Sequence, residues 1–143
     1  MGRLLKIIFL LFLSFTILSS CKKYPDGPAL SLRSKMNRVT NVWTIEKYLI
    51  DDVDQTTAML AGFYENTFQM KKDGTYSENW NSFVAPLTDG GKWEFIENKE
   101  AIKKTSDGTG TSDTLTILRL KNKEFWIKKR NGTQAIVIHY IKY

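Results

Sequence analysis

The sequence predicts an all-β protein, an eight-stranded antiparallel up-and-down barrel, on three observations. From Asn41 onward, apolar and polar residues alternate with the period of two that is typical of half-buried strands. Short polar turns interrupt this alternation at regular intervals. No amphipathic stretch of helical length separates the strands, which excludes parallel βαβ units and favours hairpins. Closure into a barrel removes the exposed edges of such a meander, and a two-sheet sandwich is the alternative.

The turn residues divide the chain into strands. We expect eight of them, at residues 41–51, 63–71, 75–81, 91–97, 100–105, 113–120, 123–130 and 133–142. Among the connectors, only residues 54–62 have a helical pattern, with Asp54 placed to cap the helix and Gly62 placed to end it.

The length of each turn predicts which residues pair. A three-residue loop at 72–74 pairs Met70 with Tyr76 and Phe68 with Glu78, which puts the large side chains on one face. Gly74 then takes the left-handed conformation that such a loop requires. The cost of this register is that the Glu78 carboxylate points inward, where it needs a partner.

Three later hairpins are read in the same way. A two-residue turn between the fourth and fifth strands pairs Phe95 with Ile102, and one between the sixth and seventh pairs Leu118 with Phe125. The last hairpin leaves two alternatives, because its final strand is apolar on both faces. A two-residue turn faces His139 outward, and a three-residue turn faces it inward.

These registers predict an interior filled by large side chains. The expected inward set is Trp43, Ile45, Leu49, Tyr64, Phe68, Met70, Tyr76, Trp80, Trp93, Phe95, Ile102, Leu118, Leu120, Phe125 and Ile127. The interior of an eight-stranded barrel is filled by such a set or leaves room for one small ligand. The candidate ligand-binding residues are Trp43, Tyr64, Phe68, Tyr76, Glu78, Trp80, Trp93 and Phe125.

An export signal precedes the predicted barrel. Arg3 and Lys6 give the N-terminus a positive charge. The mainly apolar segment that follows, residues 7–18, is shorter than the ~20 residues that a membrane-spanning helix needs. The Leu-Ser-Ser-Cys run that ends at Cys21 resembles a bacterial lipobox. We therefore expect a signal peptide at 1–20, a lipidated tether at 21–38 and a barrel domain at 39–143.

The lipobox resemblance implies a diacylglycerol on Cys21 and a further acyl chain, such as palmitate, on its freed amine. Two or more chains make a stable membrane anchor. An ordinary secretory signal is the alternative, although the sequence has no second cysteine to pair with Cys21. Since Lys22 and Lys23 follow the cysteine rather than Asp, outer-membrane attachment is favoured, on either face of that membrane.

Four segments resemble, in order and spacing, the lipocalin-like domain of small bacterial lipoproteins. They are NVWTIEKYLIDD at 41–52, FQMKKDGTY at 68–76, GKWEF at 91–95 and DTLTILRLKNKEFWI at 113–127. The resemblance covers most of residues 39–143 and implies a calyx-like barrel that is open at one end. The chain departs from animal lipocalins in having Asn41, where those have Gly, and in lacking their disulfides and C-terminal helix. Most members of the bacterial family have no assigned activity.

Composition argues against several functions. One histidine and one cysteine provide few ligands for a transition metal, and no turn presents a nucleophile to His139, so we expect neither an enzyme nor a metal or other cofactor. The Asp51, Asp52 and Asp54 cluster lacks the spacing of a calcium loop. The net charge of +6 is small and decreases when the signal is removed, and export excludes nucleic acid as a partner.

Two functions remain. The first is a lipid-anchored envelope protein that binds or carries a small apolar ligand in its barrel. The alternative is a non-enzymatic structural or protein-binding lipoprotein with a filled core. It would use an outer patch of Leu115, Ile117 and Trp126, which the predicted registers place on the outside.

Overall fold

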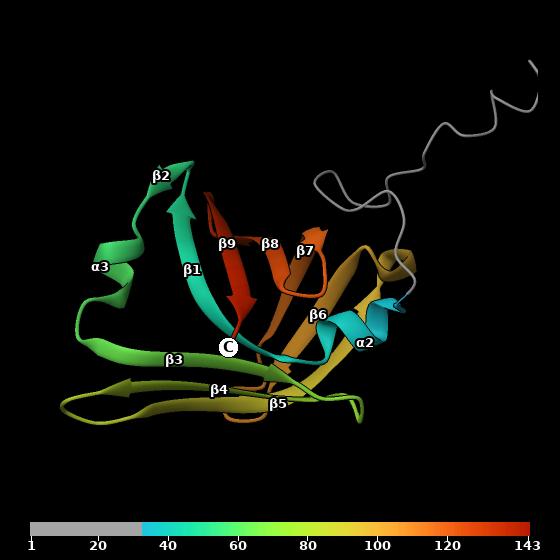
Figure 1. Cartoon of the computed structure of the whole chain (residues 1–143), viewed down its shortest axis with the longest axis horizontal. Coiled ribbons are helices and arrows are strands. Elements are labelled where there is room, and N and C mark those ends of the chain that lie inside the picture. Colours follow the sequence, from blue (N-terminus) through green and yellow to red (C-terminus); the bar gives the residue numbers. More distant parts are fainter. Residues whose placement is uncertain (1–32) are drawn as a thin grey trace, which may run out of the picture.

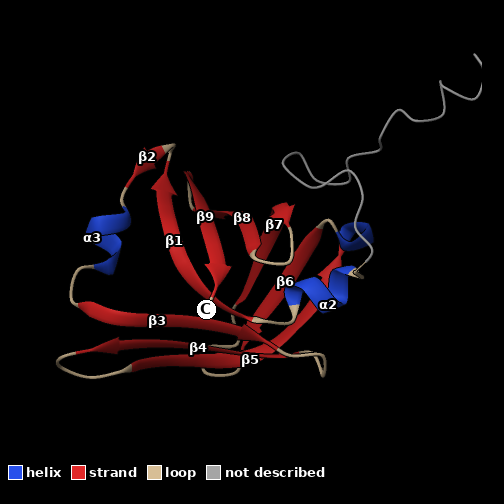
Figure 2. Cartoon of the chain, viewed as in Figure 1, coloured by secondary structure: helices blue, strands red, loops and turns tan. Residues whose placement is uncertain are grey.

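The computed structural model describes residues 33–143, so the predicted signal peptide and Cys21 lie outside the described residues. Figures 1 and 2 show the strands wrapped into a barrel, with helical segments at its ends. The elements are α2 (Lys35–Val39), β1 (Val42–Ile50), β2 (Val53–Asp54), α3 (Thr56–Leu60), β3 (Phe63–Met70), β4 (Thr75–Ser82), β5 (Leu87–Ile96), the 3-10 turn η2 (Glu97–Lys99), β6 (Ala101–Ser106), β7 (Ser112–Leu120), β8 (Glu124–Asn131) and β9 (Gln134–Lys142).

The predicted eight-stranded antiparallel barrel is confirmed. Every strand from β3 to β9 pairs with its neighbours in sequence order, and β1 pairs with both β3 and β9, which closes the sheet. The contact between β1 and β9 runs from the Trp43–Lys142 pair to the Ile50–Ile136 pair, so the closure extends along the whole of β1. The short strand β2 lies outside the barrel order and pairs only with the C-terminal end of β1, with which it forms a short hairpin.

The first predicted register is correct. Met70 pairs with Tyr76 and Phe68 with Glu78, and Gly74 has a φ of 82°. The pairing between β4 and β5 differs from the prediction, because it begins at Leu87 rather than at residue 91. Residues 87–90 have few strand-forming side chains, and they are ordered as a strand by their hydrogen bonds to β4.

The register between β5 and β6 is as predicted, with Phe95 opposite Ile102, whereas the register between β7 and β8 is not. Phe125 pairs with Leu120 rather than with Leu118. The turn is a four-residue loop that a 2.7 Å backbone hydrogen bond closes, and a bulge interrupts the pairing at Leu118. One extra residue in a strand reverses the facing of every residue beyond it.

The bulge in β7 overturns the predicted outer patch. Leu115 and Ile117 are only 4% and 1% exposed, and both belong to the barrel core. Of the three predicted residues, Trp126 alone faces outward. The Trp126 ring stacks on His139, with 3.9 Å between the ring centres, and the guanidinium of Arg119 lies 3.9 Å from the Trp126 ring centre.

His139 therefore takes the outward alternative. The connector between β8 and β9 contains two residues, Gly132 and Thr133, and it places His139 opposite Trp126. Gly132 has a φ of 59°, as a tight hairpin turn requires.

Two further bulges change the predicted inward set. In β1 the register shifts between Ile45 and Lys47, so Tyr48 is buried in place of Leu49, which faces outward. In β3 the register shifts between Phe63 and Glu65, and Tyr64 is 62% exposed on the outside of the barrel. Leu118, at the bulge in β7, also lies outside the core. The inward placement of Leu49, Leu118 and Tyr64 was wrong because the period of two does not show where an extra residue is inserted.

The helix α2 plugs one end of the barrel. Arg38 is 7% exposed, and its guanidinium donates a hydrogen bond of 2.5 Å to the carbonyl oxygen of Leu120. The Trp43 indole N–H donates to the carbonyl oxygen of Val39 at 2.9 Å, and its ring centre is 5.5 Å from that of Phe125. Trp43, Val39 and Phe125 are fully buried, so side chains fill the barrel at this end.

Candidate ligand-binding cavity

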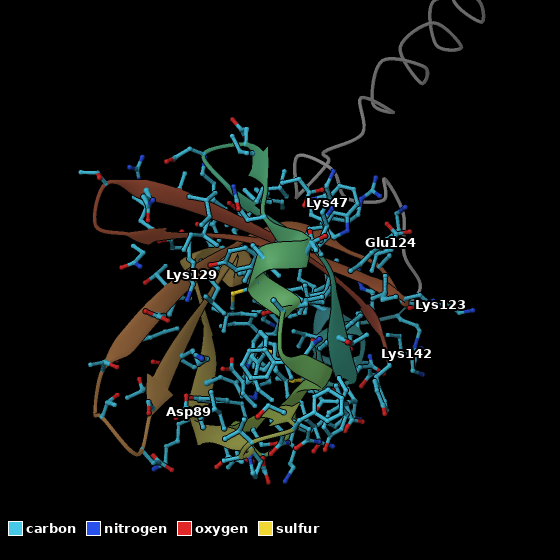
Figure 3. All side chains as sticks on the ribbon, turned by 90° about the vertical axis from the view of Figure 1, so that its left-hand side faces the viewer. Lys47, Asp89, Lys123, Glu124, Lys129 and Lys142 are labelled. Atoms are coloured by element: carbon cyan, nitrogen blue, oxygen red, sulfur yellow. The ribbon has the colours of Figure 1, made fainter. Side chains whose placement is uncertain are left out.

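A cavity of about 100 Å³ lies in the barrel at the end opposite α2, beneath the helix α3. Figure 3 views this end, with α3 crossing in front of the strands. The cavity is lined by Ile45, Tyr48, Met59, Asn66, Thr67, Phe68, Glu78, Trp80, Lys104, Lys129, Ile138 and Tyr140. Its volume exceeds the roughly 30 Å³ that one water molecule takes in the liquid, so the barrel is not completely filled by its own side chains.

The helix α3 forms the cover of this cavity. It follows the Asp51–Asp52 turn, in which both residues have positive φ, and the short strand β2. The Asp54 carboxylate accepts a hydrogen bond of 2.9 Å from the backbone N–H of Thr56, and the helix ends before Gly62, which has a φ of 86°. Met59 reaches from α3 into the cavity wall.

The inward Glu78 has a partner that the sequence analysis did not include. The Lys104 ammonium lies 2.7 Å from Glu78 Oε1 and 3.8 Å from Asp89 Oδ2. It also lies 4.8 Å from the ring centre of Tyr76. The sequence does contain a signal for Lys104, because the correctly predicted register of β5 and β6 places it opposite the inward Trp93.

Asp89 extends this ion pair into a hydrogen-bond network. It accepts from the Tyr76 hydroxyl and from the Ser106 hydroxyl, each at 2.7 Å. Burial raises the pKa of Asp89, but the hydrogen bonds from Ser106 and Tyr76 and the charge of Lys104 outweigh it, so the pKa lies below its usual value. Burial and the Asp89 hydrogen bond raise the pKa of Tyr76. The network therefore keeps Asp89 ionised and Tyr76 neutral.

Two tyrosines supply further polar groups to the cavity. Tyr48 and Tyr140 are 9% and 7% exposed, and both line the cavity. Within residues 33–143, no side chain or backbone group forms a hydrogen bond with either hydroxyl. Burial raises the pKa of both phenols, and the nearby charge of Glu78 raises the pKa of Tyr140 further. Both hydroxyls therefore keep their protons at neutral pH.

The structure divides the eight predicted ligand-binding residues into four groups. Phe68, Glu78 and Trp80 line the cavity. Tyr76 lies next to it and holds Asp89, whereas Trp43, Trp93 and Phe125 pack in the core without lining the cavity. Tyr64 is outside the barrel.

The other candidate sites of the sequence have structural roles. In the acidic cluster, Asp51 accepts a hydrogen bond from the backbone N–H of Ala135, and Asp54 accepts from Thr56. No group of three potential metal-ligating side chains occurs in the part of the chain that the structure describes. Nor does any helix within residues 33–143 have the length and hydrophobicity needed to span a membrane.

The Asp89 network predicts a pH dependence of stability. The pKa of Asp89 in the folded protein is below its unfolded value of about 3.9, so its contribution to stability is present above that pH and is lost as the pH falls through the folded pKa. We expect Asp89→Asn to lower the melting temperature at pH 7, with a difference from the wild type that shrinks as the pH approaches 3.

The control for Asp89→Asn is Asp107→Asn, at an exposed position of the β6–β7 loop. This control should have the melting temperature of the wild type at every pH. Melting curves at pH 7, 4 and 3 provide the comparison. A difference between Asp89→Asn and the wild type that stays constant from pH 7 to pH 3 would contradict the stabilising role of the ionised carboxylate.

The geometry defines a class of protein: a closed eight-stranded antiparallel barrel with one plugged end and a small, partly polar cavity at the other. Neither the models of known protein families nor the curated proteins match this sequence. The cavity and the N-terminal sequence are therefore the features of this chain that bear on its function.

Proposed function

We propose that this protein is a lipid-anchored, lipocalin-like protein of the cell envelope that binds or carries a small molecule in its barrel. The observation that supports the proposal is the cavity of about 100 Å³ at one end of a barrel whose other end α2 plugs. An eight-stranded barrel has room for its own side chains or for one small ligand. Here the side chains leave a space.

The walls of the cavity indicate what kind of ligand fits. Apolar atoms come from Ile45, Met59, Phe68, Trp80 and Ile138. Polar groups are at least as prominent in the lining and come from Tyr48, Asn66, Thr67, Glu78, Lys104, Lys129 and Tyr140. Small-molecule sites in proteins commonly combine a mainly apolar wall with a few polar groups that fix the orientation of the ligand. This wall carries more polar groups than that, so a molecule with both apolar and polar parts matches it.

The N-terminal sequence supports the anchor. The mainly apolar run at 7–18 and the lipobox-like residues before Cys21 are typical of a bacterial lipoprotein signal, and Lys22 and Lys23 favour the outer membrane. In this proposal the protein is not an enzyme. His139, the single histidine, stacks on Trp126 on the outer face and takes no part in the cavity.

The test is native mass spectrometry of the full chain after extraction with a detergent-free polymer. We expect an additional bound mass of a small molecule on the wild type. Met59→Trp fills the mouth of the cavity with a larger side chain and should reduce the bound fraction. Its control, Met36→Trp, places the same side chain on α2 at the plugged end, where Met36 is 36% exposed, and should bind like the wild type.

The proposal would be contradicted by a wild type that carries no additional mass even after incubation with lipid extracts of the cell envelope. It would also be contradicted by a bound mass that Met59→Trp and Met36→Trp retain equally. In that case the molecule would sit outside the cavity.

A further inference from the structure

The cavity contains hydrogen-bonding groups that the protein itself does not use. The hydroxyls of Tyr48 and Tyr140 have no hydrogen-bond partner within the described part of the chain, although both side chains are more than nine-tenths buried. Glu78 uses only Oε1 for Lys104, and no group within residues 33–143 bonds to its Oε2. These three groups supply two donors and one acceptor, because neutral phenols can donate and a carboxylate oxygen can accept.

The charges around the cavity are already paired. Lys104 lies 2.7 Å from Glu78 and 3.8 Å from Asp89, and Lys129 lies 3.4 Å from Asp113. A carboxylate ligand would compete with Glu78 for Lys104 and leave a partly buried acid without its partner. An ammonium ligand would compete with Lys104 for Glu78 in the same way. Leaving one charge of such a pair unpaired is costly, so the site disfavours both positively and negatively charged ligands.

An apolar surface leads from the cavity to the outside. Figure 1 shows the hairpin of β4 and β5 extending beyond the rest of the barrel at the α3 end. Trp80, which lines the cavity, pairs across the strands with Leu87, and its ring centre is 5.2 Å from that of Phe63. We call Phe63, Trp80 and Leu87 the mouth shelf. Leu87 is 58% exposed, so the outer end of the mouth shelf is open to an apolar chain.

From these observations we infer that the ligand is an uncharged amphiphile that inserts its polar head into the cavity and lays its apolar chain on the mouth shelf. The inference rests on the proposed function and adds the chemical class and the orientation of the ligand. The head both accepts hydrogen bonds, from Tyr48 and Tyr140, and donates one, to Glu78 Oε2. A hydroxyl-bearing head does both, and the cavity of about 100 Å³ holds the head without the chain.

The test compares three probes with the same eight-carbon chain and different heads: 1-monooctanoylglycerol, octanoate and octyltrimethylammonium. Their dissociation constants are measured at pH 7 by ligand-observed NMR with the full chain in a detergent-free polymer, and the polymer alone provides the blank. We expect the uncharged probe to bind at least about 10-fold more tightly than either ion. Equal or tighter binding of octanoate or octyltrimethylammonium overturns the inference and leaves the proposed function standing. Absence of binding by all three overturns both.

Matched variants test the orientation. Tyr140→Phe removes one hydroxyl without changing the ring and should weaken the uncharged probe about 2- to 10-fold, the range of one hydrogen bond. Tyr48→Phe should act similarly, and the control Tyr64→Phe makes the same change outside the barrel. Leu87→Ser should weaken binding through the chain, whereas Val84→Ser at the fully exposed hairpin tip should not. Unchanged affinity in the double variant of Tyr48 and Tyr140 would contradict a head bound in the cavity.

Discussion

Trp43→Ala is expected to lower the free energy of unfolding by about 3–5 kcal/mol, the usual cost of removing a large aromatic side chain from a core. The Trp43 side chain is fully buried, packs on Phe125 and donates a hydrogen bond to the carbonyl oxygen of Val39. Its removal leaves a cavity between α2 and the strands. It also removes one of the two hydrogen bonds that the Val39 carbonyl oxygen accepts, while the backbone N–H of Asn41 keeps the other at 2.9 Å.

The control for Trp43→Ala is Trp126→Ala, which removes the same side chain from the outer face. This variant loses the stacking of Trp126 on His139 and on Arg119, which contributes about 1 kcal/mol to the free energy of unfolding. Its indole nitrogen is buried without a hydrogen-bond partner among the described residues, so no bond is lost with it. Urea unfolding of both full-length variants provides the comparison. A cost for Trp43→Ala no larger than that for Trp126→Ala would contradict the role of Trp43 in closing the barrel.

Cys21→Ala is expected to abolish lipid attachment. If residues 18–21 are a lipobox, as their resemblance implies, the thiol of Cys21 receives the diacylglycerol. Alanine has no group that could receive it. We expect the variant to show no incorporation of labelled palmitate and to keep its N-terminal segment. The wild type should incorporate the label and sediment with the membranes, because two or more acyl chains hold a protein stably in a bilayer.

The control for Cys21→Ala is Ser20→Ala, which keeps a small residue before the cysteine and should be labelled like the wild type. Mass spectrometry of the N-terminal peptide identifies the modified residue directly. Palmitate incorporation into Cys21→Ala at the wild-type level would show that another residue carries the lipid. An unmodified Cys21 in the wild type would contradict the anchor.

The barrel could be predicted from the sequence because its signals are repeated and local. Each strand alternates between apolar and polar residues, and the loop at 72–74 sets the register that brings Phe68 opposite Glu78. A chain of hairpins in which every strand pairs with the next leaves few arrangements, and closure is the one that removes both edges.

The bulges could not be predicted in the same way. Each one adds a single residue, so the alternation on either side looks regular while the facing beyond it reverses. This is why Tyr64 lies outside, why Tyr48 lies inside, and why Ile117 belongs to the core. The position of a bulge depends on how the strands twist around the closed barrel, which the local sequence does not encode.

The candidate site was only partly predictable for the same reason. Glu78 follows from the turn at 72–74, and Lys104 follows from the pairing of β5 with β6. Tyr48 depends on the bulge in β1, and the facing of Tyr140 is ambiguous because its strand is apolar on both sides. The polar groups of the cavity come from residues far apart in sequence, and only the closed barrel brings them together.

The central claim, that the end of the barrel beneath α3 takes up a small molecule, is tested most directly by NMR contacts from a bound probe. With 1-monooctanoylglycerol, we predict nuclear Overhauser effects from the probe to the side chains of Met59 and Ile138, which line the cavity, and none to Leu120 in the fully buried core. Contacts confined to exposed residues such as Val84, with none to Met59 or Ile138, would contradict the claim.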